Sequence, residues 1–450
     1  MSRVHRELTP IVRWLRSDDL LTPPGLEDKA RLLLLDTVGC ILAGLSAAPV
    51  AQFAREHQLL GGGAALHPIA RAQVFAMAAT WDEACEGLAR AHGRPGVAVI
   101  ACLLALADRP SVTLGSLLAD MVAGYEIGAR MGEWLRNKPG MHVDAGWPAL
   151  GVAAAIARHF GGSADDMLAA IETTSCQLAL GLYAPVAAGA TARNTYLAHA
   201  ATLGMLAAVA TRAGIDAPTN GLAEQARIGY GLDESQVVLA PPGEWLIQEC
   251  YLKPFAAVRH VHYGVQAALA LRPALYARLH EIDAIDLQVY PEALTYCGNR
   301  APATPIAAQF SLSFGVAAAL RFGDLSPAVY RPGQFHEAGL RQLEALVTLT
   351  ADESLAHVST QNAGRAARLR VRCGDQTFEQ LVTSVKGDVH DPFSSLDCER
   401  KFADYAAAAL VDTASVNALA AAILRGRLDA SAADVLQPIS TALHGQLSRA

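Results

Sequence analysis

Long apolar segments separated by short polar breaks make up most of the chain before about residue 270. Segment 25–44 is apolar on nearly all sides, which is typical of a helix at the centre of a bundle. Apolar residues also recur at helical spacing in segments 97–108, 117–125, 149–159 and 189–214. This pattern predicts consecutive antiparallel helices packed around a large core.

The pattern changes after about residue 281, where apolar and polar residues alternate and β-branched residues become frequent. Segments 282–290, 367–373 and 378–385 therefore predict strands. The segments 307–323 and 339–350 between them predict helices. A sheet with helices in this order indicates an α+β arrangement.

The predicted fold is therefore mainly α, with two domains. A large all-helical domain comprises residues 1–270 together with a helical tail, 397–450, that packs back on it. A smaller α+β domain with an antiparallel sheet comprises residues 275–395. The length of 450 residues agrees with two domains, because it exceeds what one core usually supports.

Composition supports the helical prediction and limits the partners. Hydrophobic residues make up 52% of the chain but aromatic residues only 6%, so alanine carries much of the apolar content, as in closely packed helices. The formal charge is −7, and there is no long basic run. We therefore expect no nucleic-acid or membrane partner, and local Arg and Lys residues would have to hold an anionic substrate.

The sequence also predicts a cytoplasmic protein without metal. The eight cysteines are scattered and form no CxxC pair, which favours a reduced cytosolic chain over a disulfide framework or a zinc or iron–sulfur site. The N-terminal segment has mixed charge and lacks the apolar core of a signal peptide. Asp36 interrupts the apolar stretch 32–50, so a buried helix is expected instead of a membrane span.

Titratable residues are densest in segment 251–262, YLKPFAAVRHVH, which contains Lys253, Arg259, His260 and His262. This density favours one wall of a pocket for a carboxylate. The alternative is a loop before a helix, with solvated basic residues. A metal site at the two histidines is a weak alternative, because no Cys or third His has matching spacing.

Similar polar groups occur beside turns at the edges of other apolar helices. They are Asp82, Glu83, His92, Arg94, His142, Asp144 and Arg193. Arg and Lys in such a set can hold a di- or tricarboxylate while His removes a proton from the carbon next to a carboxylate. Arg193 has two open interpretations: it binds an anion at a helix start, or it pairs with a nearby carboxylate.

A series of motifs extends over nearly the whole chain: LLLLDTVGCILAG, HGRPG, GYEIGARM, GMHVDAGW, KPFAAVRHVH, AQFSLSFGVAAAL and KGDVHDPFSSLDCERKF. In order and spacing they resemble the MmgE/PrpD family, whose members include 2-methylcitrate dehydratase, cis-aconitate decarboxylase and iminodisuccinate epimerase. The resemblance implies a helical domain closed by the C-terminal tail, a smaller α+β domain and a homodimer. It also implies no metal and no organic cofactor.

The resemblance assigns positions one by one in the first half of the chain. Asp82 is the best match to the family's acidic segment, with Glu83 beside it. Arg94 replaces the histidine of the family's HPG signature, and His92 is a nearby substitute. His142 matches the GxH histidine directly, while Asp144 replaces the threonine two residues later.

In the second half, Lys253 matches the KP lysine, and His260 and His262 match the paired histidines that follow. Arg193 replaces a common lysine, and Phe314 replaces a tyrosine found in some members. Arg94 removes a candidate acid or base but adds a group that can hold a carboxylate, and Phe314 removes a proton donor.

We therefore expect a cofactor-independent lyase that dehydrates a small hydroxy-di- or tricarboxylate of the 2-methylcitrate type. The predicted catalytic residues are His142 for proton transfer, Lys253 as charge stabiliser or proton donor, Asp82 to orient a neighbouring His or Lys, and His92. The predicted substrate-binding residues are Arg94, Arg193, Arg259, His260, His262 and Asp144. Epimerisation, decarboxylation and non-catalytic carboxylate binding remain alternatives.

Overall fold

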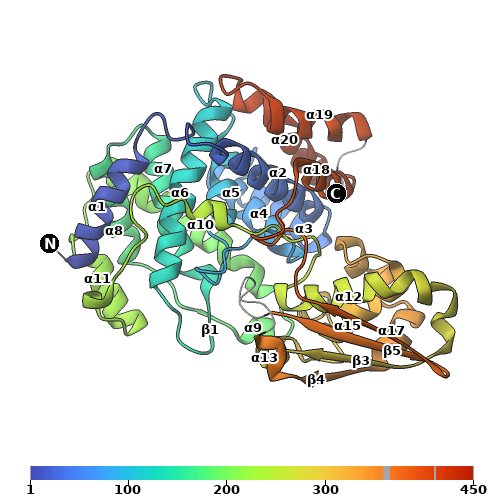
Figure 1. Ribbon diagram of the computed structural model, residues 1–450. Coiled ribbons are helices and arrows are strands. Elements are labelled where there is room, and N and C mark those ends of the chain that lie inside the picture. The colour runs from blue at the N-terminus through green and yellow to red at the C-terminus, as the bar shows by residue number, and fades with distance from the viewer. Residues whose placement is uncertain (1, 358–364, 410–411, 449–450) are drawn as a thin grey trace.

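The protein consists of a large helical body and a smaller lobe that contains a sheet (Figure 1). The structure, a computed structural model, describes residues 2–357, 365–409 and 412–448. The helical body contains the following elements: α1 Arg3–Leu15, α2 Leu26–Leu45, α3 Ala48–Leu60, α4 Pro68–Trp81, α5 Val97–Leu106, α6 Leu114–Trp134, β1 Met141–His142, α7 Pro148–His159, α8 Ala164–Ser175, β2 Gly181–Leu182, α9 Ala184–Ala187, α10 Tyr196–Arg212 and α11 Gly221–Gln225.

Helix α5 is the centre of this body, and all of its residues are buried. Helices α4, α7 and α10 pack around it, as its uniformly apolar sequence predicts. Helices α6 and α7 approach closely because glycines face each other: a Cβ at Gly151 would lie 2.5 Å from the carbonyl oxygen of Gly124. The prediction of packed helices is confirmed.

The C-terminal tail returns to the helical body. Its helices are α18 Ser395–Ala406, α19 Thr413–Arg425 and α20 Ala432–Ser448. All three contact α2, so the first and last parts of the chain lie side by side (Figure 1). A buried ion pair joins them, since Nζ of Lys401 lies 2.6 Å from the carboxylate of Asp36.

The smaller lobe is built on a sheet of four strands in the order β4-β3-β5-β6. Its elements are α12 Arg259–Leu275, β3 Ile282–Val289, α13 Pro291–Cys297, α14 Pro305–Ala308, α15 Leu312–Phe322, α16 Pro332–Phe335, α17 Ala338–Ala345, β4 Val347–Ala351, β5 Ala367–Cys373 and β6 Gln376–Val382. Helix α12, which the predicted division assigned to the helical domain up to residue 270, packs on β5, β6 and α15.

The sheet is mixed, not purely antiparallel. Strands β3, β5 and β6 pair antiparallel as expected, with Val289 opposite Ala367, but β4 runs parallel to β3. The helix predicted over 339–350 was therefore wrong at its end: the helical part stops at Ala345, and Val347–Ala351 is a strand. The β-branched residues Val347, Thr348 and Thr350 favour this extended conformation.

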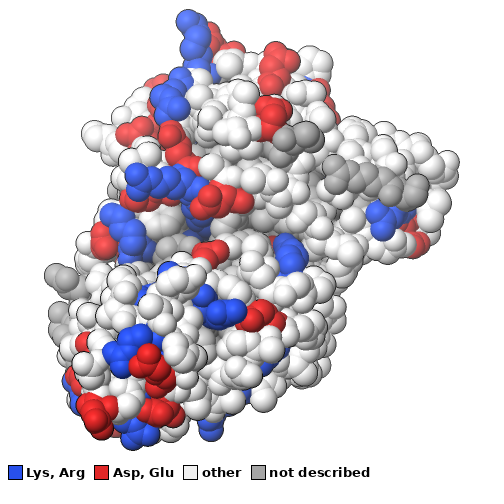
Figure 2. Space-filling view, turned by 90° about the vertical axis from the view of Figure 1, so that its right-hand side faces the viewer, with Lys and Arg blue, Asp and Glu red and all other residues white. Residues whose placement is uncertain are grey.

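The charges on the surface are mixed in sign, and few of the described helices are long and apolar. On the face shown in Figure 2, acidic and basic side chains lie next to one another, and neither sign forms a continuous patch. Among the described residues, no single helix is long and apolar enough to cross a membrane; only the bent pair α2 and α3, at 85° to each other, reaches that length and composition together. All eight cysteines are free.

Candidate active site

A buried carboxylate surrounded by three cations marks the candidate site. Glu83 lies in the loop between α4 and α5, and its side chain is almost completely buried. Nζ of Lys253 lies 2.7 Å from Oε1 of Glu83. Arg94 contacts Oε2 at 3.2 Å, and Arg193 is hydrogen-bonded to the same oxygen. Charges buried to this degree are stable only when they are paired and hydrogen-bonded.

The cluster holds more positive than negative charge. Nε of Arg94 also lies 3.3 Å from the carboxylate of Asp144. Lys253, Arg94 and Arg193 thus face two carboxylates, those of Glu83 and Asp144, which leaves one positive charge unbalanced within this group. Such an excess in a region shielded from water attracts an anion strongly.

The loop that carries Glu83 is tied to the segment before Lys253. The backbone of Gly87 and that of Tyr251 exchange two hydrogen bonds, of 3.1 and 2.9 Å. A Cβ at position 87 would lie 2.2 Å from the hydroxyl oxygen of Tyr251, so a larger residue there would displace the Tyr251 ring. This pairing fixes the position of Lys253 relative to Glu83.

Two lysines hold the backbone of this loop at consecutive carbonyl groups. Lys253 donates to the carbonyl oxygen of Glu83 at 3.0 Å, and Lys401 donates to that of Ala84 at 2.8 Å. Glu83 has φ of 54°, a left-handed conformation that is costly for a residue with a Cβ. The lysines stabilise this conformation, which directs the Glu83 carboxylate into the cluster.

Burial changes the proton affinity of Lys253. Desolvation, together with the charge of Arg94, lowers the pKa of Lys253 to about 8. Lys253 is still mostly protonated at neutral pH. It can therefore stabilise developing negative charge or release a proton within the physiological range.

His142 lies on the edge of this cluster, in β1, which pairs antiparallel with β2 although α7 and α8 lie between the two strands in sequence. The backbone N–H of Asp144 donates to Nδ1 of His142 at 3.2 Å, and Oδ2 of Asp144 lies 3.8 Å from the same nitrogen. Burial lowers the pKa of His142, the charge of Arg94 adds to that effect, and Asp144 opposes it. The imidazole is thus neutral near pH 7, with its Nε2 end directed away from Asp144.

The structure separates Asp82 from the other predicted catalytic residues. Its carboxylate forms two hydrogen bonds with Arg331, of 2.7 and 2.9 Å, and does not contact His142 or Lys253. The neighbouring Glu83 makes the contact with Lys253 that had been expected of Asp82. The two adjacent acids look alike in the sequence and are both buried, but the backbone at Glu83 is left-handed and its carboxylate faces Lys253, whereas that of Asp82 faces Arg331.

His92 is not part of the cluster either. It is exposed, with φ of 52°, and its ring has no hydrogen-bond or ion-pair partner among the described residues. The guanidinium of Arg94, two residues later, turns inward instead.

The three residues at the start of α12 contact other groups. Arg259 pairs with Asp388 at 2.6 Å. Nδ1 of His260 lies 2.5 Å from the hydroxyl oxygen of Tyr290, and Nε2 of His262 donates to the carbonyl oxygen of Ala257 at 2.9 Å. Burial lowers the pKa of His260 to about 3 and that of His262 well below its usual value, so both rings are neutral.

Of the two interpretations of Arg193, the structure shows the pairing with a carboxylate. Its guanidinium contacts Glu83 and donates to the carbonyl oxygen of Thr80 at 3.3 Å. Its Nε is nevertheless buried without a hydrogen-bond partner within the described residues. One donor thus remains for a bound anion.

Phe314 and the surface cavities lie outside this arrangement. Phe314 is fully buried against Tyr330 and Phe335 in the smaller lobe.

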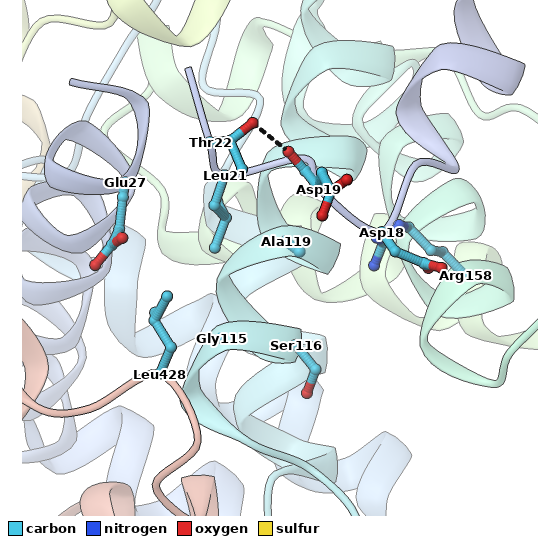
Figure 3. A pocket seen from close by; sticks show the side chains of 10 residues that line it. All are labelled: Asp18, Asp19, Leu21, Thr22, Glu27, Gly115, Ser116, Ala119, Arg158 and Leu428. Carbon is cyan, nitrogen blue, oxygen red and sulfur yellow. Dashed lines mark hydrogen bonds between the residues drawn. The ribbon is translucent and has the colours of Figure 1, made fainter. Parts of the chain in front are cut away.

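Two surface cavities, of about 470 and 380 Å³, are lined by residues of the helical body and include no member of the cluster. Figure 3 shows the larger one, where Asp19, Glu27 and Arg158 lie around α6. No group of three or more potential metal ligands occurs among residues 2–357, 365–409 and 412–448.

Fold and site define a two-part helical protein with a buried, cation-rich cluster at its core, suited to an anionic ligand. Family models describe the chain in the same two parts: the MmgE/PrpD N-terminal domain matches residues 7–234, and the MmgE/PrpD C-terminal domain matches residues 255–426. The chain therefore belongs to the MmgE/PrpD family, which includes dehydratases. No curated protein matches it. The C-terminal match includes α12, in agreement with its packing on the sheet.

Proposed function

We propose that the protein is a lyase that removes water from a small hydroxy-di- or tricarboxylate of the 2-methylcitrate type, without a metal or organic cofactor. The observation that carries this proposal is the convergence of Lys253, Arg94 and Arg193 on one buried loop, next to the neutral His142. Elimination of water requires a base for the carbon proton and fixed positive charge for the carbanion. This group of residues offers both.

Substrate binding relies on the unbalanced positive charge. A carboxylate that approaches the cluster can take the free Nε donor of Arg193 and share Arg94 with Asp144. Guanidinium groups suit this role because they bind carboxylates through two parallel hydrogen bonds. Binding then shields the carboxylate from water and strengthens its interaction with Lys253.

Proton abstraction falls to His142. Its neutral imidazole accepts the proton from the carbon next to the carboxylate at Nε2. For this step the ring takes the tautomer with its proton on Nδ1, which then faces Oδ2 of Asp144 instead of accepting from the backbone N–H of Asp144. Asp144 then stabilises the resulting imidazolium through Nδ1, over a gap that is 3.8 Å before the substrate binds. Lys253 stabilises the electron pair left on the substrate.

The alternatives share this carbanion and differ in its fate. Epimerisation returns the proton to the opposite face, and decarboxylation releases carbon dioxide. Non-catalytic binding is favoured by one observation: ion pairs with Glu83 already engage all three cations. A homodimer in the cytoplasm remains part of the proposal.

The proposal is tested by incubating the protein with malate, citrate and 2-methylcitrate in deuterated water and recording proton NMR spectra. A vinylic signal supports dehydration, and deuterium in recovered substrate without alkene supports epimerisation. His142→Gln should abolish the signal, while His280→Gln, at a side chain that is 79% exposed, should retain it. A thermal shift without turnover would identify a binding protein, and no exchange, product or shift would refute the proposal.

A further inference from the structure

A tyrosine with no role assigned so far, Tyr183, lies beside His142 where β1 pairs with β2. His142 in β1 is opposite Gly181 in β2, and the backbone N–H of Tyr183 donates to the carbonyl oxygen of Gly140 at 2.8 Å. Tyr183 follows the end of β2 directly, as the residue before α9. Their rings are nearly parallel, at 16°, with centroids 6.1 Å apart.

A second tyrosine contacts His142, but its hydroxyl proton is already used. The ring of Tyr196 lies 5.6 Å from that of His142, and its hydroxyl donates to the carbonyl oxygen of Leu182 at 2.9 Å. The hydroxyl of Tyr183, by contrast, has no hydrogen-bond partner among the described residues. Tyr183, a half-buried phenol whose hydroxyl is not hydrogen-bonded to any described residue, therefore lies beside His142, the proposed base.

We propose that Tyr183 is the acid that protonates the departing hydroxyl group; this inference rests on the dehydration proposed above. His142 takes the proton from carbon, the C–H electron pair becomes the double bond, and the C–O bond breaks. The Tyr183 proton joins the departing oxygen, which leaves as water. The products are an alkene, a phenolate at Tyr183 and an imidazolium at His142, and proton transfer from His142 to Tyr183 restores both residues.

The surroundings of Tyr183 suit a proton donor. Burial raises the pKa of Tyr183, so its hydroxyl is protonated at neutral pH and gives up its proton only to a strongly basic group such as the departing hydroxide. Phe314, which replaces the tyrosine found in some family members, lies in the core of the smaller lobe and has no hydroxyl proton to donate. Lys253, the other donor available, is held by two contacts to Glu83.

Tyr183 also lies where the two parts of the protein meet. Its ring contacts the edge of Tyr296, from α13 in the smaller lobe, with centroids 5.7 Å apart. Figure 1 shows α9, which begins directly after Tyr183, near α13 and β1. A substrate beside His142 and Tyr183 is thus within reach of both parts, and Tyr296 provides a neighbouring phenol for comparison.

The test compares two leaving groups. Malate, citrate and 2-methylcitrate, and the analogues in which fluorine replaces the departing hydroxyl, are given to the wild type, Tyr183→Phe and Tyr296→Phe. Fluoride leaves without protonation, whereas hydroxide does not. We expect Tyr183→Phe to lose at least about a hundredfold in kcat on the hydroxy acid that the wild type converts, and to convert the fluoro analogue at close to the wild-type rate. Tyr296→Phe should behave like the wild type on both.

Each other outcome counts against the inference in a recognisable way. Equal losses of Tyr183→Phe on both substrates would mean a structural role, and no loss on the hydroxy acid would mean that another group supplies the proton. Both results overturn the inference and leave the proposed dehydration intact. If the wild type converts none of the acids, the proposed function fails and the inference fails with it.

Discussion

Replacing Glu83 by glutamine is the sharpest perturbation of the cluster. The change preserves the shape of the side chain but removes the charge that balances Lys253, Arg94 and Arg193. The Oε1 contact to Lys253 is 2.7 Å and the Oε2 contact to Arg94 is 3.2 Å, and all groups involved are buried. Removing one partner of a buried ion pair costs about 3–5 kcal/mol, because the opposite charge remains without compensation.

We therefore expect Glu83→Gln to lower the free energy of unfolding by about 3–5 kcal/mol near pH 7. The loss should shrink at alkaline pH. The pKa of Lys253 is about 8 in the folded protein and 10.5 ordinarily, so between these values the unfolded chain binds the extra proton. In this pH range the free energy of unfolding therefore rises with pH. Removing the Glu83 charge lowers the folded-state pKa of Lys253, so in Glu83→Gln the rise starts at lower pH.

The assay is urea unfolding followed by circular dichroism at pH 7 and pH 9.5. Glu133→Gln is the matched control, since Glu133 forms a partly exposed ion pair with Arg90 at 2.8 Å. A pair of that kind contributes only about 0–1 kcal/mol. A loss for Glu83→Gln no larger than that of the control, or a loss that grows at pH 9.5, would refute the reasoning.

Three further predictions concern neighbouring groups. Burial raises the pKa of Glu86 to about 7, so the folded protein holds a proton there that the unfolded chain has lost. Between pH 4.5 and 7 the free energy of unfolding, measured by urea titrations, should therefore fall by up to about 3 kcal/mol more in the wild type than in Glu86→Gln. Lys401→Met leaves Asp36 buried without its partner and should cost about 3–5 kcal/mol in the same assay, with partial recovery when Asp36→Asn is added. Burial lowers the pKa of His142, and Asp144 opposes this shift. The midpoint of the acid limb of the kcat/KM profile should therefore lie below pH 6.5 in the wild type and lower still in Asp144→Asn. A midpoint that rises in Asp144→Asn would contradict the assigned roles.

Periodicity predicted most of the fold. The fully buried α5 and the alternating strands β3, β5 and β6 follow from patterns that depend on local sequence alone. Strand β4 escaped prediction because the preceding helix leads into it with only Leu346 between them. Its pairing with β3 is a contact distant in sequence, which no local pattern encodes.

The candidate site was predicted in part. Motif resemblance led to Lys253, Arg94 and Arg193, which all contact Glu83, and to His142, which lies beside Asp144, the second partner of Arg94. Sequence reasoning missed Glu83 as the centre because it depends on one left-handed backbone angle.

Tyr183 was missed for a similar reason. It occurs in an ordinary apolar segment, and its closeness to His142 depends on the pairing of β1 with β2. Neither composition nor spacing predicts that two segments this short, separated by α7 and α8, will pair.

The central claim is that Lys253 stabilises a carbanion formed next to a substrate carboxylate. The most direct measurement is the initial rate of alkene formation from 2-methylcitrate, citrate or malate by the wild type, Lys253→Met and the exposed-site control Lys138→Met. The account predicts a rate at least about a hundredfold lower for Lys253→Met, since loss of one preorganised charge contact costs that much, and an unchanged rate for Lys138→Met. Equal rates for the wild type and a folded Lys253→Met would contradict it.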